Sequence, residues 1–393
     1  MKREWILIIA LLAILVLSAC GQPAETPTTM PSTYEDDCNT IAVTEGTVTY
    51  TATVLGQEYD SGVTQFDLSE ASGSQTQQLL VELANFPALT DVQLGGGFAP
   101  SDVKALMDGL PGVTVHYSFA LFGKTVSTTD ERLEYVNVEI GDEGLAQIRQ
   151  ALDIMPACTY LKLDRCGTTD NAMAKLRDDY PNTKVVWRIF FAFYNCLTDT
   201  EVLRCIRELD DENVEVLKYC TDVKYLDMGH NTELANFDFI NYMPKLEIAI
   251  IVDSQIPSLE PFGNCPKLQW LEIVNCQEVR DLAPLANCTH LKGLNISANF
   301  SIDDLTPLYG LQEMERLFLG HQDLSEEDVK AVQNALPNCW VSIGAKSTDI
   351  VSYNYSFGWR LNEDGSRADW YQFVREIFRV DDNYYNHYKN DGQ

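Results

Sequence analysis

A short pattern of apolar positions recurs along the second half of the chain, at spacings of 22 to 23 residues. Apolar residues stand at a reference position, at three residues before and after it, and at six and eight residues after it. The reference positions are Cys220, Met243, Cys265, Cys288 and Leu311. The apolar pair at six and eight places both side chains on one face of a short strand. The spacing therefore predicts one strand in every copy.

A small polar or sulfur-bearing residue follows eleven positions after each reference residue, where the chain has to turn. These residues are Asn231, Ser254, Cys276, Asn299 and Gln322. Their side chains can satisfy backbone groups of the neighbouring coil and so form a ladder. Because no copy can bury its apolar face alone, we expect the copies to stack into a solenoid.

The stretch from Asp281 to Leu319 follows the pattern L-x-x-L-x-L-x-x-N/C most closely. This stretch resembles the leucine-rich repeats of internalin-type bacterial surface proteins. The resemblance covers roughly residues 220–343. It implies an α/β leucine-rich-repeat solenoid, with parallel strands on the concave face and short helices or turns on the convex face. For function it implies only binding.

The first half of the chain carries a longer version of this pattern. Two copies fit the register, namely Phe86, Leu89, Val92 and Leu94, and then Met155, Cys158, Leu161 and Leu163. Each is followed by apolar residues at helical spacing, a proline, and alternating β-branched residues, which predicts a helix and then a strand. Residues 328–343 repeat this arrangement at the end of the regular repeats.

Strand-turn-strand inserts separate the long-period copies. They start at Tyr50, Tyr117 and Trp187, which are 67 and 70 residues apart, and Gly56 matches Gly123 at the turn of the first two. We interpret this half as a tandem array of long units joined to the regular solenoid. The alternative is that the inserts form a small separate sheet.

The chain after Ala345 is rich in aromatic residues, and we expect it to cap the open end of the solenoid. A strand near residues 353–360 and a helix near residues 368–379 would form this C-terminal cap. The predicted segments are a signal peptide (1–19), a lipidated cysteine with a disordered tether (20–37), long-period repeats with β inserts (38–219), regular repeats (220–344), the cap (345–380) and a frayed tail (381–393).

The N-terminus has the pattern of a secretory signal. Lys2 and Arg3 precede an apolar run of 13 residues, which is short of the about 20 residues that span a bilayer. Residues 17–20, Leu-Ser-Ala-Cys, resemble the lipobox of bacterial lipoproteins, which implies lipid attachment at Cys20. Two acyl chains give stable anchoring. We expect a protein held at the outer face of the cell membrane in a Gram-positive-like envelope, with the outer membrane as the alternative.

The formal charge of −30 argues against nucleic acid as a partner, because nucleic-acid binding favours basic patches. Eleven cysteines in an exported chain suggest disulfides, but most of them occupy repeat positions and so behave as small core residues. Cys38, Cys196 and Cys205 lack a repeat position, and a Cys196–Cys205 bridge is one option. We expect no metal and no cofactor. Motifs for a nucleophile elbow, a metalloprotease or a phosphate loop are absent from the sequence, so we expect no enzyme.

Positions five, seven and nine after each reference residue point out of the concave sheet. Solvent-facing strand positions are usually polar, yet several here are apolar or aromatic. The predicted binding stripe consists of Tyr225, Ile248, Ile250, Val252, Trp270, Val274, Arg316 and Phe318. Exposed apolar patches commonly mark interaction sites. The alternatives are that the tail or the tether covers the stripe, or that the register is shifted by one.

Two functions fit these expectations. The first is a non-catalytic module that binds a protein on a host, on another microbe or in the same envelope. The second is a glycan-binding module or a non-catalytic subunit of an envelope complex, since Trp270, Tyr225 and Phe318 could stack on sugars. The aliphatic residues Ile248, Ile250 and Val252 favour a protein.

Overall fold

The computed structural model describes residues 50–320, 324–343 and 369–378. All of them belong to one compact unit, Tyr50–Gln393. The predicted signal peptide, Cys20, the tether, the ladder residue Gln322, the strand at 353–360 and the tail at 381–393 lie outside the described residues.

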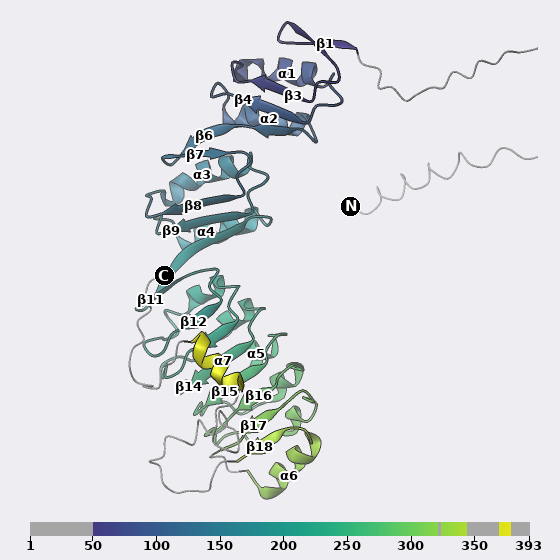
Figure 1. The fold of residues 1–393 in the computed structure, drawn as a ribbon. Coiled ribbons are helices and arrows are strands. Elements are labelled where there is room, and N and C mark those ends of the chain that lie inside the picture. The colour runs from purple at the N-terminus through teal and green to yellow at the C-terminus, as the bar shows by residue number, and fades with distance from the viewer. Residues whose placement is uncertain (1–49, 321–323, 344–368, 379–393) are drawn as a thin grey trace, which may run out of the picture. The chain divides into compact units, whose positions relative to one another are not determined.

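The N-terminal part repeats one order of elements: a hairpin, a strand, a helix, a strand, a helix and a strand (Figure 1). The first copy comprises β1 (Thr51–Val54), β2 (Gln57–Asp60), β3 (Gln65–Leu68), η1 (Gly73–Gln75), α1 (Thr76–Leu83), β4 (Asp91–Leu94), α2 (Pro100–Gly109) and β5 (Thr114–His116). The second comprises β6 (Ser118–Leu121), β7 (Lys124–Ser127), β8 (Arg132–Val136), α3 (Gly141–Leu152), β9 (Tyr160–Asp164), α4 (Asp170–Asp179) and β10 (Lys184–Phe191). Strand β10 then turns back into β11 (Tyr194–Leu197).

The three inserts are antiparallel hairpins closed in the same way. In the second, Tyr117 N donates to Thr128 Oγ1 at 3.1 Å, and Thr128 N donates to the Tyr117 carbonyl at 3.0 Å. Ser61 and Thr198 hold the other two hairpins by the same pair of hydrogen bonds. Gly56 and Gly123 adopt φ of 83° and 78° at their turns, a conformation that glycine tolerates best.

The regular repeats form one parallel sheet of seven strands. These are β12 (Val202–Arg204), β13 (Tyr225–Asp227), β14 (Ile248–Val252), β15 (Trp270–Val274), β16 (Gly293–Asn295), β17 (Arg316–Phe318) and β18 (Trp340–Ser342). Residues five after each reference position pair directly across β13 to β17. The register is therefore the one that the repeat spacing predicts.

Short helices return the chain along the convex side of each coil. They are η2 (Glu215–Tyr219), η3 (Asp238–Tyr242), α5 (Glu260–Gly263), η4 (Ala283–Asn287) and η5 (Thr306–Leu308), followed by the longer α6 (Glu326–Ala335) before β18. The five reference residues are fully or almost fully buried, so they form a continuous core between the sheet and these helices. This leucine-rich-repeat architecture confirms the fold predicted for this region.

The ladder residues bind the backbone of neighbouring coils. Asn299 Nδ2 donates to the carbonyls of Ile273 and Ile296 at 2.7 and 2.9 Å, and its Oδ1 accepts from Cys276 N at 2.7 Å. Asn231 makes the equivalent three hydrogen bonds three coils earlier in the stack. Because these polar backbone groups are buried, each ladder side chain removes a cost that would otherwise oppose stacking.

A left-handed residue follows the strands at a constant register, five positions after the first residue of the strand. The column comprises Asn137, Arg165, Arg207, His230, Asp253, Asn275 and Ala298, with φ between 53° and 72°. It marks the point at which each coil leaves the sheet.

The nine cysteines among the described residues are all free. Cys205 and Cys220 are buried, and the pKa of each thiol lies well above its usual range. Burial is the main cause for Cys205, whereas the hydrogen bond with Cys196 is the main cause for Cys220, followed by burial. Cys196 Sγ lies 3.7 Å from Cys220 Sγ. The structure therefore places Cys196 beside Cys220, at the junction between the long-period part and the regular repeats, and this contact differs from the predicted option of Cys205.

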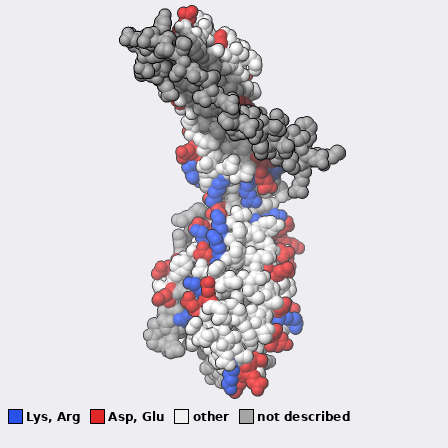
Figure 2. Space-filling model, turned by 90° about the vertical axis from the view of Figure 1, so that its right-hand side faces the viewer, with Lys and Arg blue, Asp and Glu red and all other residues white. Residues whose placement is uncertain are grey.

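Among the residues that the structure describes, no helix is both long and apolar enough to cross a membrane. Figure 2 shows a broad uncharged area in the lower half of one face, with acidic side chains along its right-hand margin.

Candidate functional site

The predicted binding stripe lies on one face of the parallel sheet, as the strand pairing requires. Tyr225, Ile248 and Trp270 stand side by side on β13, β14 and β15, and Ile250 follows two positions after Ile248. The Trp270 indole covers Gly293 on the next strand, where an added Cβ would meet the ring at 1.8 Å. Glycine at that position leaves room for the large ring to lie flat against the sheet. The apolar surface formed by Ile248, Ile250, Trp270 and Phe318 is called the apolar floor below.

Helix α7 (Asp369–Ile377) lies across this floor, shown in yellow over the strands in Figure 1. Val374 and the adjoining Phe378 are 2% and 4% exposed and pack in one cluster with stripe residues. The stripe members of that cluster are Ile248, Ile250, Trp270 and Phe318, with Tyr225 and Val252 at its margin. The tail was expected to cap the open end, and the part of it that is described packs on the concave face. The reason is that its apolar side chains meet an apolar surface there.

The contact between α7 and the stripe uses one face of the helix. Tyr371, Val374 and Phe378 follow the spacing of an amphipathic helix. Phe373 is half-exposed, and its ring lies at 80° to the Tyr225 ring with a centroid distance of 5.6 Å. A helix of nine residues is shorter than the about 12–15 residues that isolated helices need in water. The helical state of α7 therefore depends on its contact with the sheet.

Charged side chains stand at both ends of α7. Arg204 Nη1 on β12 donates to the Phe378 carbonyl at 2.9 Å, which satisfies a backbone acceptor at the helix C-terminus and suits the helix dipole. Arg316 on β17 lies near the other end. Burial lowers the pKa of its guanidinium, while the carboxylates of Glu315 and Asp369 oppose that shift. The two arginines thus help to fix where the helix lies on the sheet.

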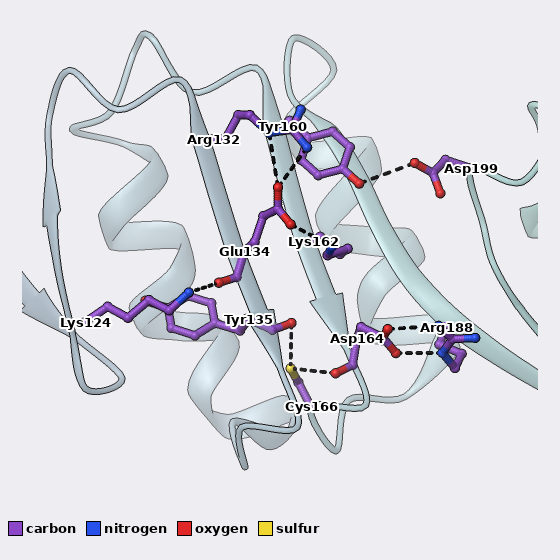
Figure 3. A network of polar contacts seen from close by, with 10 residues as sticks. All are labelled: Lys124, Arg132, Glu134, Tyr135, Tyr160, Lys162, Asp164, Cys166, Arg188 and Asp199. Atoms are coloured by element: carbon purple, nitrogen blue, oxygen red, sulfur yellow. Dashed lines mark hydrogen bonds and ion pairs between the residues drawn. The ribbon is translucent and has the colours of Figure 1, made fainter. Parts of the chain in front are cut away.

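The same face of β8, β9 and β10 is charged (Figure 3). Glu134 accepts from Arg132 at 2.8 Å and from Lys162 at 2.6 Å. These hydrogen bonds lower the pKa of Glu134, and the one from Lys162 has the larger effect. The Arg132 guanidinium stacks over the Tyr160 ring at 3.8 Å, and the Tyr160 hydroxyl donates to Asp199 at 3.3 Å. Because these charges pair with one another, they hold the strands rather than present one sign of charge to a ligand.

A buried ion pair closes this charged region. Arg188 on β10 donates from Nε and Nη2 to the two carboxylate oxygens of Asp164 on β9, at 2.7 and 2.9 Å. Both side chains are under a tenth exposed. The hydrogen bonds from Arg188 lower the pKa of Asp164 despite its burial. Arg188 Nη1 also donates to Asn195 Oδ1 on β11 at 2.7 Å, which links the two strands of the third hairpin.

A polar row follows the strand ends at the left-handed column. His230 Nδ1 contacts Asp253 Oδ2 at 2.5 Å, and Asn275 Nδ2 donates to Asp253 Oδ1 at 2.6 Å. The hydrogen bond from His230 is the largest cause that lowers the pKa of Asp253. Within the described ranges, no three His, Cys, Asp or Glu side chains are grouped so that they could hold a metal ion. The row links successive coils.

The repeat spacing located the stripe, but it did not place Arg204 or the α7 residues in the site. The tail had one detectable signal, the helical spacing of Tyr371, Val374 and Phe378, and its folding over the stripe was one of the alternatives. Val274 is buried at the edge of the stripe and Arg316 is half-buried over the Trp340 ring at 5.1 Å. The binding role of all eight stripe residues remains a prediction.

No protein-family model matches the chain, and no curated protein matches its sequence. Among solved structures, it is similar to an internalin F from Listeria monocytogenes, with 19% identity over 66% of this chain and 69% of that chain and a TM-score of 0.34. Internalin C2 from the same species gives 17% identity, 69% and 91% coverage and a TM-score of 0.32. A leucine-rich-repeat protein from Leptospira interrogans gives 13%, 67% and 74%, and 0.34. The fold assignment of this chain rests on its own repeat spacing and strand register.

Proposed function

We propose that the chain is a membrane-anchored surface lipoprotein that binds a protein partner through the concave face of its repeats and performs no catalysis of its own. The observation that carries this proposal is the apolar floor. Its members Ile248, Ile250 and Trp270 lie on β14 and β15, and their side chains point away from the core of the repeats. Apolar side chains at such positions need a cover that shields them from water, which α7 provides within the chain and a partner would provide in its place. Aliphatic groups there suit a protein better than a sugar.

The anchor is the second part of the proposal. The apolar run and the lipobox-like residues 17–20 support export, lipidation of Cys20 and residence at the outer face of the cell membrane. An outer-membrane location is the alternative. In both cases the repeats would face partners outside the cytoplasm.

Lipidation can be tested with labelled palmitate in growing bacteria that express the full chain. We expect label in the wild type and in Cys38→Ser, and none in Cys20→Ser, because only Cys20 follows the lipobox-like residues. Equal labelling of Cys20→Ser and the wild type would contradict the anchor.

Partner binding can be tested by affinity capture with the full chain as bait. The concave variant is Trp270→Ala with Ile250→Asp. The control is Tyr242→Ala with Asn264→Asp, because both residues lie exposed on the convex side. We expect a protein captured by wild type and control to be lost with the concave variant, since a charge on the apolar floor opposes burial by a partner.

The melting temperatures of both variants are measured first, so that unfolding is not mistaken for lost binding. Capture of the same proteins by a folded concave variant would contradict binding through this face. Binding of sugars on a glycan array, lost with Trp270→Ala, would favour the glycan-binding alternative.

A further inference from the structure

We propose that the apolar floor over β13 to β17 is a docking site for an amphipathic helix, that α7 is its occupant within the chain, and that a partner helix has to displace α7 to bind. This inference rests on the proposed function, because it names the kind of partner that the concave face accepts.

The first argument is the fit of α7 itself. Val374 and Phe378, one helical turn apart, both lie on the floor with Ile248, Ile250 and Trp270. Their spacing matches that of side chains on one face of a helix. The apolar floor is flat enough to accept a helix because Gly293 has no side chain to displace the Trp270 ring. The site therefore accepts a helix with apolar residues four positions apart.

The second argument is the charge around the floor. Arg204 donates to the carbonyl of Phe378, the residue that directly follows α7, and the Asp369 carboxylate acts on Arg316 at the opposite end. The two arginines select the direction of a bound helix, since its C-terminal carbonyls favour a cation and its first turn favours an acid beside Arg316. The expected partner helix thus starts with an acidic residue and crosses the strands from β17 towards β12.

The third argument concerns competition. Helix α7 contacts the floor through a small number of side chains, while Asp369, Gln372 and Glu376 are exposed. Because α7 has nine residues and isolated helices need about 12–15, its helical state depends on docking to the apolar floor. Because α7 belongs to the same chain, it competes with any partner at a high effective concentration. Partner binding and α7 docking exclude each other, so α7 sets the affinity threshold of the site.

The test uses a fluorescent synthetic peptide with the sequence of residues 366–381, titrated against full-length chains and followed by anisotropy. The chains are the wild type, Val374→Asp, and Gln372→Asp as the matched control. Both variants add one negative charge to α7, but only Val374 faces the floor. We expect the peptide to bind Val374→Asp at least tenfold more tightly than it binds the wild type or Gln372→Asp.

Further variants make the result specific. Phe378→Asp, with the folded state of each chain checked by melting temperature, is expected to behave like Val374→Asp. Adding Ile250→Asp to Val374→Asp is expected to abolish peptide binding, because it places a charge on the floor. The proposal would be overturned if the peptide bound the wild type and Val374→Asp with equal affinity. It would also be overturned if the peptide bound neither Val374→Asp nor Phe378→Asp.

The outcomes also separate this inference from the proposed function. Peptide binding needs no external partner, so it can occur even if affinity capture finds none, which would count against the proposed function alone. Capture of a partner through the concave face without peptide binding would overturn the helix proposal alone.

Discussion

Replacing Arg188 with methionine is expected to lower the free energy of unfolding by about 3 kcal/mol, because it leaves the charged Asp164 buried without its partner. Methionine keeps much of the length of the side chain, so the loss reports the charge pair more than the packing. Both charged side chains are under a tenth exposed, and the bond between them is bidentate. Urea denaturation of the full chain at neutral pH measures the effect.

Arg132→Met is the matched control. Arg132 also pairs with a carboxylate, Glu134, but its side chain is 57% exposed, so the expected loss is at most about 1 kcal/mol. A loss for Arg188→Met no larger than that for Arg132→Met would show that the buried pair does not stabilise the fold.

The pH dependence of this pair has a defined sign. The folded protein holds the pKa of Asp164 below its usual value of 3.8. The stabilisation is therefore fully present above the unfolded pKa and is lost as the pH falls through the lowered, folded pKa. The contribution of the pair to wild-type stability is expected to persist at mildly acidic pH and to be lost only in strong acid. In Arg188→Met, burial without a partner favours protonation of Asp164, so the difference between the two proteins is expected to shrink already at mildly acidic pH.

Replacing Asn299 with alanine is expected to cost about 3 kcal/mol, because it removes three hydrogen bonds between a buried side chain and backbone groups of the stack. Asn299 is fully buried, and its hydrogen bonds to the Ile273 and Ile296 carbonyls and from Cys276 N are all shorter than 3.0 Å.

Asn287→Ala serves as the comparison, because Asn287 is exposed at the end of η4, on the convex side of its coil and away from the ladder. Its expected effect lies within about 0.5 kcal/mol. Thermal or chemical denaturation of both variants gives the answer. If Asn299→Ala is no less stable than Asn287→Ala, the ladder does not contribute as described.

The sequence predicted the regular repeats well for a physical reason. Each coil buries the same positions against its neighbours, so residues such as Leu226 and Leu271 recur at one spacing and fix the strand register. The same periodicity placed the outward-facing Tyr225, Ile248 and Trp270 on one surface. The helix and strand predicted in residues 328–343 correspond to α6 and β18, because their pattern also depends only on residues close together in the sequence.

Contacts outside the repeat period could not be predicted in this way. Val374 meets Ile250 although more than a hundred residues separate them in sequence, and no spacing rule links the two. Asp164 belongs to the recurring pattern, but its partner Arg188 lies on β10, where the strand runs on into a hairpin. The contact between the free thiols of Cys196 and Cys220 likewise joins a hairpin to a repeat position. Such contacts depend on how two different patterns meet in space.

The left-handed column at the strand ends has a consequence for how such a protein can vary. Four of its seven residues are Asn, Asp or His, which tolerate positive φ comparatively well. Arg165, Arg207 and Ala298 bear a larger conformational cost, roughly 1–2 kcal/mol each. Glycine or asparagine at these three positions would remove part of that cost without touching the core or the concave floor. Thermal tolerance and ligand choice can therefore change independently, one coil at a time.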